Sequence, residues 1–206
     1  SGIPPSSSAL VVIPTMITSV GNIDDLVEAL EVRFLANRDD NLRFGLLTDF
    51  RDAPAESMPE DAALLEHASR RIDALNALYG GDAFYLFHRP RRWNPGERVW
   101  MGFERKRGKL ADLNWLLRAA GPSSVSERFS VVVGNLAALA GTRYVITLDT
   151  DTQLPRDAAR QFVGTMAHPL NRPLLDDGSG LVSGGYGILQ PRVSPSLPGM
   201  NRSRYA

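Results

Sequence analysis

The sequence contains no cysteine, so disulfide bonds and thiolate metal ligands are excluded for this chain. It has no excess charge of either sign, because 23 Lys and Arg residues balance 23 Asp and Glu residues. Nucleic-acid binding normally needs clustered cations, so no nucleic-acid partner is expected. No apolar run approaches the roughly 20 residues that span a bilayer. The histidines His67, His88 and His168 lack metal-ligand spacing, and no serine–histidine–acid triad is recognisable.

The bulk composition is that of a globular domain. Hydrophobic residues make up 43% and charged residues 22% of the 206 positions, enough for one large domain with its own core. We expect the Pro- and Ser-rich residues 1–8 to be a linker, since they lack the charged start of a signal peptide, and residues 9–206 to form one domain. The last residues, 201–206, show no natural stop signal, which indicates a piece of a longer protein.

Apolar strand-like segments alternate with helix-like segments along the chain. This order predicts an α/β fold with a mostly parallel sheet flanked by helices. The expected strands are 10–14, 43–48, 83–88, 128–133, 143–148 and 181–190. The expected helices are 23–37 capped by Asn22, 57–78 with a capping box at Ser57 and Glu60 and a stop at Gly80, 109–120, and 155–166. Exposed loops are expected at 89–96, which is basic, and at 171–180, which is polar.

The most informative segment is 144–152, an apolar strand that ends in two carboxylates one residue apart, Asp149 and Asp151. If the chain stays extended, both side chains point to one side. Two hard oxygen ligands at the mouth of an α/β sheet can hold Mg²⁺ or Mn²⁺ and, through the ion, a diphosphate. The alternative is a solvated corner between strand and loop, with carboxylates that only cap a helix.

Two further motifs carry candidate chemistry. Asp49 and Asp52 follow the second expected strand, where a carboxylate can accept hydrogen bonds from a uracil imide or a ribose hydroxyl. The alternative is a turn, in which aspartate is common. The basic segment 104–109 precedes a helix and suits a phosphate, although it lacks the spacing of a P-loop and also fits a solvated basic loop.

In this order, the motifs resemble a family 2-type glycosyltransferase of the GT-A fold. More narrowly, they are similar to the glucosyltransferase region of cyclic β-1,2-glucan synthases. The matching segments are 11–15, 46–53, 105–114, 146–152 and 187–191, which are distributed over most of the length of the chain.

The resemblance implies a role for each matching residue. Thr15 and Asp49 would line a uridine pocket, and Lys109 and Asn114 would lie near the nucleotide and its phosphates. Asp149 would face the ribose or donor sugar and, with Asp151, hold a divalent metal, Mg²⁺ or Mn²⁺. The implied donor is UDP-glucose, the acceptor is a glucan, and the product is a β-1,2-linked glucan made with inversion. The region would face the cytosol at the bacterial inner membrane and contact further domains of the same membrane protein.

One departure from the pattern leaves other functions open. An inverting transferase needs a carboxylate base, and none of the family's later motifs is found between Thr152 and Ala206; Asp176 and Asp177 do not match. The chain is therefore expected to bind donor without completing transfer, with the general base outside it. One alternative is a haloacid-dehalogenase-like phosphatase with Asp149 as nucleophile and Asp151 as acid and base. Another is a non-catalytic regulatory or docking domain.

Overall fold

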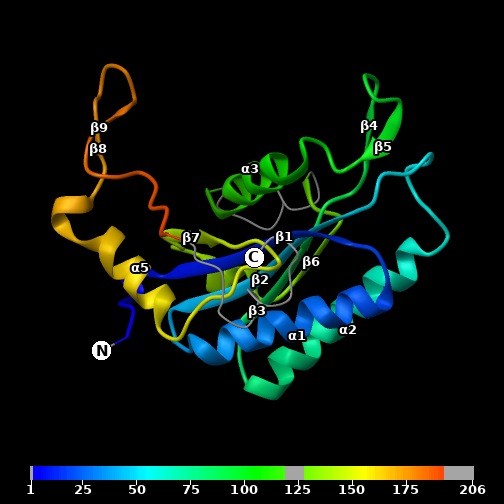
Figure 1. The fold of residues 1–206 in the computed structure, drawn as a ribbon, viewed down its shortest axis with the longest axis horizontal. Helices are drawn as coiled ribbons and strands as arrows, with labels where there is room; N and C mark the ends of the chain where they lie inside the picture. The colour runs from blue at the N-terminus through cyan, green and yellow to red at the C-terminus, as the bar shows by residue number, and fades with distance from the viewer. Residues whose placement is uncertain (1, 119–127, 193–206) are drawn as a thin grey trace, which may run out of the picture. The chain divides into compact units, whose positions relative to one another are not determined.

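The computed structural model describes residues 2–118 and 128–192, and the chain divides into two compact units between Val163 and Gly164. The first unit holds a five-stranded sheet of order β6-β3-β2-β1-β7 (Figure 1). Its parallel strands are β1 (Ala9–Ile17), β2 (Leu42–Phe50), β3 (Phe84–His88) and β7 (Tyr144–Thr147). At one edge, β6 (Val131–Val133) runs antiparallel to β3. The predicted α/β class with a mostly parallel sheet is confirmed.

Helices cover both faces of this sheet. The helices α1 (Val20–Ala36) and α2 (Asp61–Tyr79) lie on one face, and α3 (Arg105–Arg118) lies on the other (Figure 1). Successive residues of β1 therefore enter different cores: Val11 packs in the α1–α2 core, whereas Val12 packs in the α3 core. A strand buried on both sides must be apolar at consecutive positions, which is why 10–13 is an unbroken apolar run.

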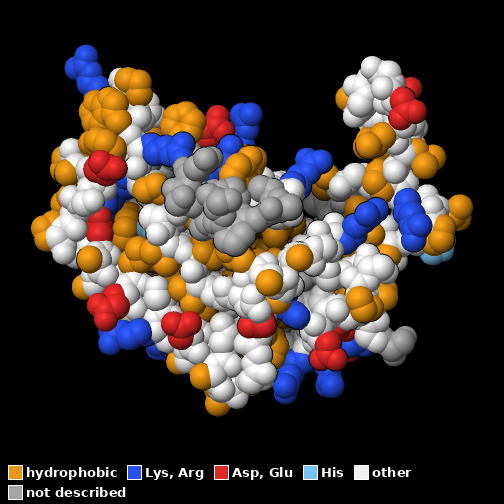
Figure 2. All heavy atoms as spheres, turned by 180° about the vertical axis from the view of Figure 1, so that it is seen from behind, with side chains coloured by type: hydrophobic (Ala, Val, Ile, Leu, Met, Phe, Trp, Pro, Cys, Tyr) orange, Lys and Arg blue, Asp and Glu red, His pale blue; other side chains and the backbone are white. Residues whose placement is uncertain are grey.

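The remaining elements are short. In the first unit they are η1 (Pro5–Ser7), β4 (Arg92–Asn94), β5 (Val99–Met101) and η3 (Leu136–Leu139). The helix α5 (Ala158–Ala167) begins in the first unit and ends in the second, which also holds η4 (Pro169–Asn171), β8 (Leu174–Leu175) and β9 (Val182–Gly184). Within the described residues, no helix is both long and apolar enough to cross a membrane. On the face seen in Figure 2, described basic side chains are interspersed with acidic and hydrophobic ones.

The first residues are tied to the first unit. Ile3 is buried, and its amide donates to Asp39 Oδ2 at 2.8 Å, while its carbonyl accepts from Asn41 Nδ2 at 2.7 Å. The carbonyl of Ser8 accepts from the amide of Arg143 at 2.8 Å. Residues 3–8, which the sequence predicts as a linker, thus contact the folded unit, and their role as a connection to other domains stays a prediction.

The structure corrects several predicted helix starts. The helix α1 is capped by Ser19, whose side chain accepts from the amide of Asn22 at 3.1 Å, so Asn22 is not the cap. No side chain caps α2, which begins at Asp61 after the N-cap residue Glu60, so the capping box predicted at Ser57 and Glu60 is wrong. The Asp61 carboxylate accepts from the amide of Met58 and pairs with Arg91. Gly80 ends α2 in the left-handed conformation, as predicted.

The segment before Lys109 was also assigned incorrectly from the sequence. The helix α3 begins at Arg105, so the basic segment is its first turn rather than a loop before it. Lys109 consequently lies in the second turn. The predicted end of this helix, 119–120, lies outside the described residues.

Two predicted loops and two predicted strands also differ from the elements in the structure. The basic segment 89–96 contains β4, and the polar segment 171–180 contains β8, because each pairs with a later strand that periodicity does not reveal. The expected strand 181–190 is only Val182–Gly184. Strand β1 does not end at Pro14 but continues to Ile17. Proline has no amide hydrogen to donate, but β1 pairs with β7 only as far as Val12, so no hydrogen bond between these two strands is lost at Pro14.

A buried histidine makes folding sensitive to acid. His88 is fully buried, its Nδ1 lies 2.8 Å from Thr48 Oγ1, and burial lowers the pKa of its imidazole to about 3. The unfolded chain binds this proton near pH 6.5, so stability from neutral His88 is complete above that pH and is lost as the pH falls towards 3. We expect the free energy of unfolding, measured in urea, to fall by up to about 1.4 kcal/mol per pH unit in this window.

The acid sensitivity has a matched control. The double variant Thr48→Val, His88→Leu removes the titrating ring without leaving its hydroxyl partner unpaired, and should flatten the pH dependence. Replacing His168, which caps the exposed η4 through the amide of Leu170, by Gln should leave the slope unchanged. A slope that survives the double variant would show that another group controls acid unfolding.

Candidate functional site

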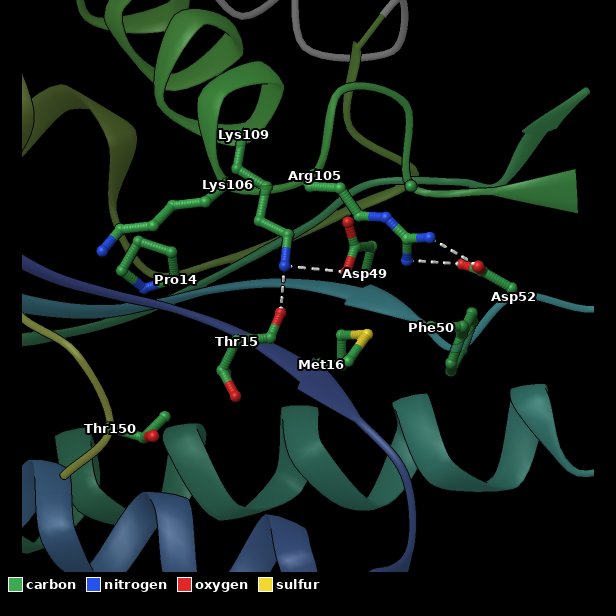
Figure 3. A pocket seen from close by; sticks show the side chains of 11 residues that line it. Pro14, Thr15, Met16, Asp49, Phe50, Asp52, Arg105, Lys106, Lys109 and Thr150 are labelled. Carbon is green, nitrogen blue, oxygen red and sulfur yellow. Dashed lines mark hydrogen bonds and ion pairs between the residues drawn. The ribbon is translucent and has the colours of Figure 1, made fainter. Parts of the chain in front are cut away.

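A cleft of about 270 Å³ opens where β1 and β2 end (Figure 3). From β1 the chain passes through α1 to β2, which lies beside β1 in the sheet. The later strand β7 lies on the opposite side of β1, so the direction in which strands are added to the sheet reverses at β1. In open α/β sheets, ligands bind in the crevice outside the carboxyl ends of strands at such a reversal. The cleft is therefore where this fold is expected to hold a ligand. Its lining residues are Pro14, Thr15, Met16, Asp49, Phe50, Asp52, Gly102, Arg105, Lys106, Lys109 and Thr150.

A buried carboxylate forms the inner wall of the cleft. Asp49 is 2% exposed; its Oδ1 lies 2.8 Å from Lys109 Nζ and its Oδ2 lies 3.2 Å from Arg89 Nη2. Lys109 Nζ also donates to the carbonyl of Thr15, which fixes α3 to the end of β1 (Figure 3). Burial lowers the pKa of the Lys109 ammonium, and the charge of Asp49 opposes that shift. Asp49 and Lys109 are thus bound to each other and position the cleft wall.

Arg89 continues this buried network on the other side of Asp49. Arg89 is 4% exposed, and its guanidinium pairs with Asp112 at 2.8 Å and donates to the carbonyl of Phe103 at 3.1 Å. The sequence predicts an exposed basic loop here, which is wrong for Arg89 and for Arg91, which pairs with Asp61. The cause is that both arginines find carboxylates from other elements, which offset the cost of burying their charge.

Glycine is required where the backbone crosses this carboxylate. A Cβ atom at Gly102 would lie 1.8 Å from Asp49 Oδ2 and 2.4 Å from its Cγ. Neither atom can retreat, because both oxygens of Asp49 are held by cations. Gly102 thus allows the segment between β5 and α3 to close over Asp49.

The accessible charges lie on the first turn of α3. Arg105 makes a bidentate pair with Asp52 at 2.9 and 2.8 Å, and its side chain is 54% exposed (Figure 3). Lys106 Nζ lies 2.5 Å from Asp149 Oδ1, with side chains 49% and 63% exposed. Exposed pairs of this kind contribute only about 0.2–1 kcal/mol, so an incoming anion or cation can replace either partner.

The two predicted metal ligands lie on a turn, not on an extended strand. The amide of Thr152 donates to the carbonyl of Asp149 at 3.0 Å, which closes the turn. Arg33 of α1 holds it from behind, since its guanidinium donates to the carbonyls of Thr150 at 2.8 Å and Thr152 at 2.7 Å. Arg33 is 7% exposed; burial lowers the pKa of its guanidinium and the charge of Asp151 opposes the shift. We refer to residues 149–152 as the acidic turn.

The structure brings most of the predicted site residues to one place. Asp49 and Lys109 line the cleft, as does Thr150 between the two aspartates, and Asp149 reaches it through Lys106. Thr15 contributes its backbone, and Figure 3 shows its side chain pointing away from Lys109. Asn114 is exposed, further along α3, and is not a lining residue. Among the described residues, no three His, Asp or Glu side chains cluster as a metal site.

Sequence reasoning missed four residues that build this site: Arg33, Arg89, Gly102 and Lys106 as the partner of Asp149. A signal existed for Arg33, because it falls on the apolar stripe of α1 with Leu26, Leu30 and Phe34. A cation on such a stripe needs a buried acceptor. For Gly102 and Arg89 the sequence holds no comparable signal, since their partners come from β2 and from distant positions on α3.

The first unit is an α/β domain with a mostly parallel sheet and a cleft at the carboxyl ends of β1 and β2. No family model matches the chain. It is 45% identical over 199 residues, 95% of its length, to the cyclic β-(1,2)-glucan synthase NdvB of Rhizobium meliloti (strain 1021). The chain spans only 7% of the length of that relative.

Proposed function

We propose that this chain is the donor-binding part of a glucosyltransferase that acts in cyclic β-1,2-glucan synthesis and binds UDP-glucose with a divalent metal. The observation that carries the proposal is the convergence on one cleft of the buried Asp49–Lys109 pair, the exposed cations of α3 and the acidic turn. The similarity to NdvB over 95% of the chain supports a role in glucan synthesis. The proposal further assigns the domain to the GT-A type.

The charges of the cleft suit a nucleoside diphosphate. Lys106 and Arg105 are half exposed and hold only exchangeable surface partners, so their cationic groups can turn to phosphate oxygens. Lys109 is bound to Asp49 and Thr15, and therefore positions this wall instead of reaching into solvent. The proposal places uridine against the wall formed by Asp49 and the end of β1.

The donor set fits a divalent ion held jointly with phosphate. Mg²⁺ is usually bound by one or two carboxylates together with substrate phosphates, and Mn²⁺ also accepts oxygen ligands. Asp149 and Asp151 are exposed on one short turn, and we propose both as the protein ligands. A bound ion would neutralise the charge of the diphosphate leaving group. Asp149 would exchange its pair with Lys106 for the ion, and Arg33 would keep the turn in place.

Calorimetric titration with UDP in the presence and absence of Mn²⁺ tests this proposal. We expect saturable UDP binding that weakens at least tenfold without Mn²⁺ and in Asp151→Asn, a loss of about 1.4 kcal/mol or more. Asp73→Asn, an exposed carboxylate on α2, is the matched control and should bind as the parent does. Metal-independent binding, or equal affinities in the two variants, would reject the role of the acidic turn.

The two alternative functions make different predictions. A phosphatase would release phosphate from nitrophenyl phosphate with Mg²⁺ and lose that activity in Asp149→Asn. A docking domain would fold normally and bind neither UDP nor phosphate ester. Three parallel strands precede the acidic turn, and Asp149 pairs with a lysine that can contact phosphate. Both features accord with donor binding.

A further inference from the structure

The β4–β5 hairpin carries two tryptophans that the cleft does not use. Trp93 and Trp100 lie directly opposite each other, with ring centroids 5.9 Å apart and planes inclined by 57°. Trp93 is 47% exposed and Trp100 is partly buried. Their mutual packing stabilises a hairpin whose strands are only three residues long. It leaves nearly half of the Trp93 side chain open to solvent.

The hairpin is fixed to the rim of the cleft. The amide of Ala53 donates to the carbonyl of Trp100 at 2.9 Å, and the amide of Trp100 donates to the carbonyl of Ala53 at 3.0 Å. Ala53 follows Asp52, and β5 leads within one residue into Gly102; both Asp52 and Gly102 line the cleft. A molecule that leaves the cleft along this rim therefore meets the tryptophan pair. Figure 2 shows hydrophobic side chains with basic ones beside them on the projecting hairpin, at the upper left.

We propose that the Trp93–Trp100 pair binds a β-1,2-linked glucan chain, the acceptor, next to the donor cleft. The inference rests on the proposed function and names where its second substrate lies. A glucose ring presents an apolar C–H face that packs on an indole, and hydroxyls around its edge that bond to polar groups. The hairpin supplies both, since exposed Glu97 and Arg98 form its turn with Pro95 and Gly96.

Charge favours a neutral ligand over an anionic one. The hairpin turn carries one acid and one base, Glu97 and Arg98, and Glu97 lies 3.9 Å from Arg105 of α3. The chain as a whole has no net charge. A membrane surface or a polyanion would need a cluster of unopposed cations. A glucan needs only flat apolar area and exchangeable hydrogen bonds.

Intrinsic fluorescence can report on the pair directly. The chain has three tryptophans, and the third, Trp115, packs beneath Arg128 with the guanidinium 4.5 Å from its ring. In a Trp115→Phe background, the remaining emission comes from the hairpin. We expect a saturable change on titration with a linear β-1,2-gluco-oligosaccharide, and no saturable change when Trp93→Ala is added to this background.

Two variants separate binding from hairpin stability. Trp93→Ala and Trp93→Leu should each weaken oligosaccharide binding at least tenfold, the leucine keeping an apolar cross-strand contact so that the hairpin persists. Amide exchange at Ala53 verifies that persistence, and calorimetry with UDP and Mn²⁺ should be unchanged in both. Parent-like oligosaccharide affinity in Trp93→Leu would overturn the proposal. Failed UDP binding with intact glucan binding would instead reject the donor assignment.

Discussion

Gly102→Ala is expected to destabilise the protein by about 3–5 kcal/mol and to abolish ligand binding in the cleft. The new Cβ would lie 1.8 Å from Asp49 Oδ2, so either the carboxylate or the segment between β5 and α3 must move. Moving the carboxylate breaks its pairs with Lys109 and Arg89, and breaking a buried ion pair costs about 3–5 kcal/mol. Urea unfolding measures the loss, and UDP calorimetry measures the effect on the cleft.

The same substitution elsewhere in the first unit provides the control. Gly21 lies in α1 with no atom within 4 Å of a built Cβ, so Gly21→Ala should be neutral or stabilising by up to about 1 kcal/mol. A double-mutant cycle identifies the cause, since Asp49→Ala removes the contacts at 1.8 and 2.4 Å and leaves only the Cβ of residue 49 at 3.0 Å, so Gly102→Ala should cost less in that background. If it costs as much in that background as in the parent, the close approach to Asp49 is not the reason for glycine here.

Arg33→Met is expected to lower the free energy of unfolding by about 3 kcal/mol and to release the acidic turn. Methionine keeps most of the apolar stem but removes every donor, and each carbonyl left buried without a partner costs about 1–3 kcal/mol. Thr150 and Thr152 both lose their guanidinium contacts. Hydrogen exchange at the amide of Thr152, which closes the turn onto Asp149, should accelerate well beyond the change at central β2 amides.

Arg70→Met on α2 is the comparison for this loss. Arg70 is 69% exposed and lies 3.9 Å from Glu66, so its replacement should change stability by no more than about 0.5 kcal/mol. Arg33→Lys should give an intermediate loss, because a single ammonium reaches fewer carbonyls than a guanidinium. If Arg33→Met weakened UDP and Mn²⁺ binding no more than Arg70→Met does, the contacts of Arg33 with the acidic turn would contribute to folding alone.

The sequence predicted the central strands of the sheet better than the elements that close the cleft. Segments 10–14, 43–48 and 83–88 each match most of a strand, because a centre buried on both faces forces an unbroken apolar run. The β4–β5 hairpin was missed, because strands of three residues show no periodicity above chance. The start of α3 was placed four residues late, because charged residues hide a helical turn whose apolar contacts begin only at Leu110.

For the site, the sequence predicted individual residues but not the partners that hold them. Asp49, Lys109, Asp149 and Asp151 were identified from their place after strands or before a helix. The structure brings Asp49, Lys109 and Asp149 to the cleft or its rim, and Asp151 lies on the same turn as Asp149. Their partners were not predicted, because Arg89 is 40 residues from Asp49 and Arg33 is 117 residues from Thr150. Such pairs form only when the sheet order brings β3 beside β2 and β7 beside β1.

The sequence by itself determined the alternation of strands and helices, the absence of thiol chemistry, and the carboxylates at strand ends, since all of these follow from local residue types and their spacing. Only the tertiary structure decided which charges are buried and paired, which remain open to a ligand, and where Gly102 lets two segments touch. The physical reason is that burial and electrostatic pairing depend on distances between residues far apart in the chain, and folding alone sets those distances.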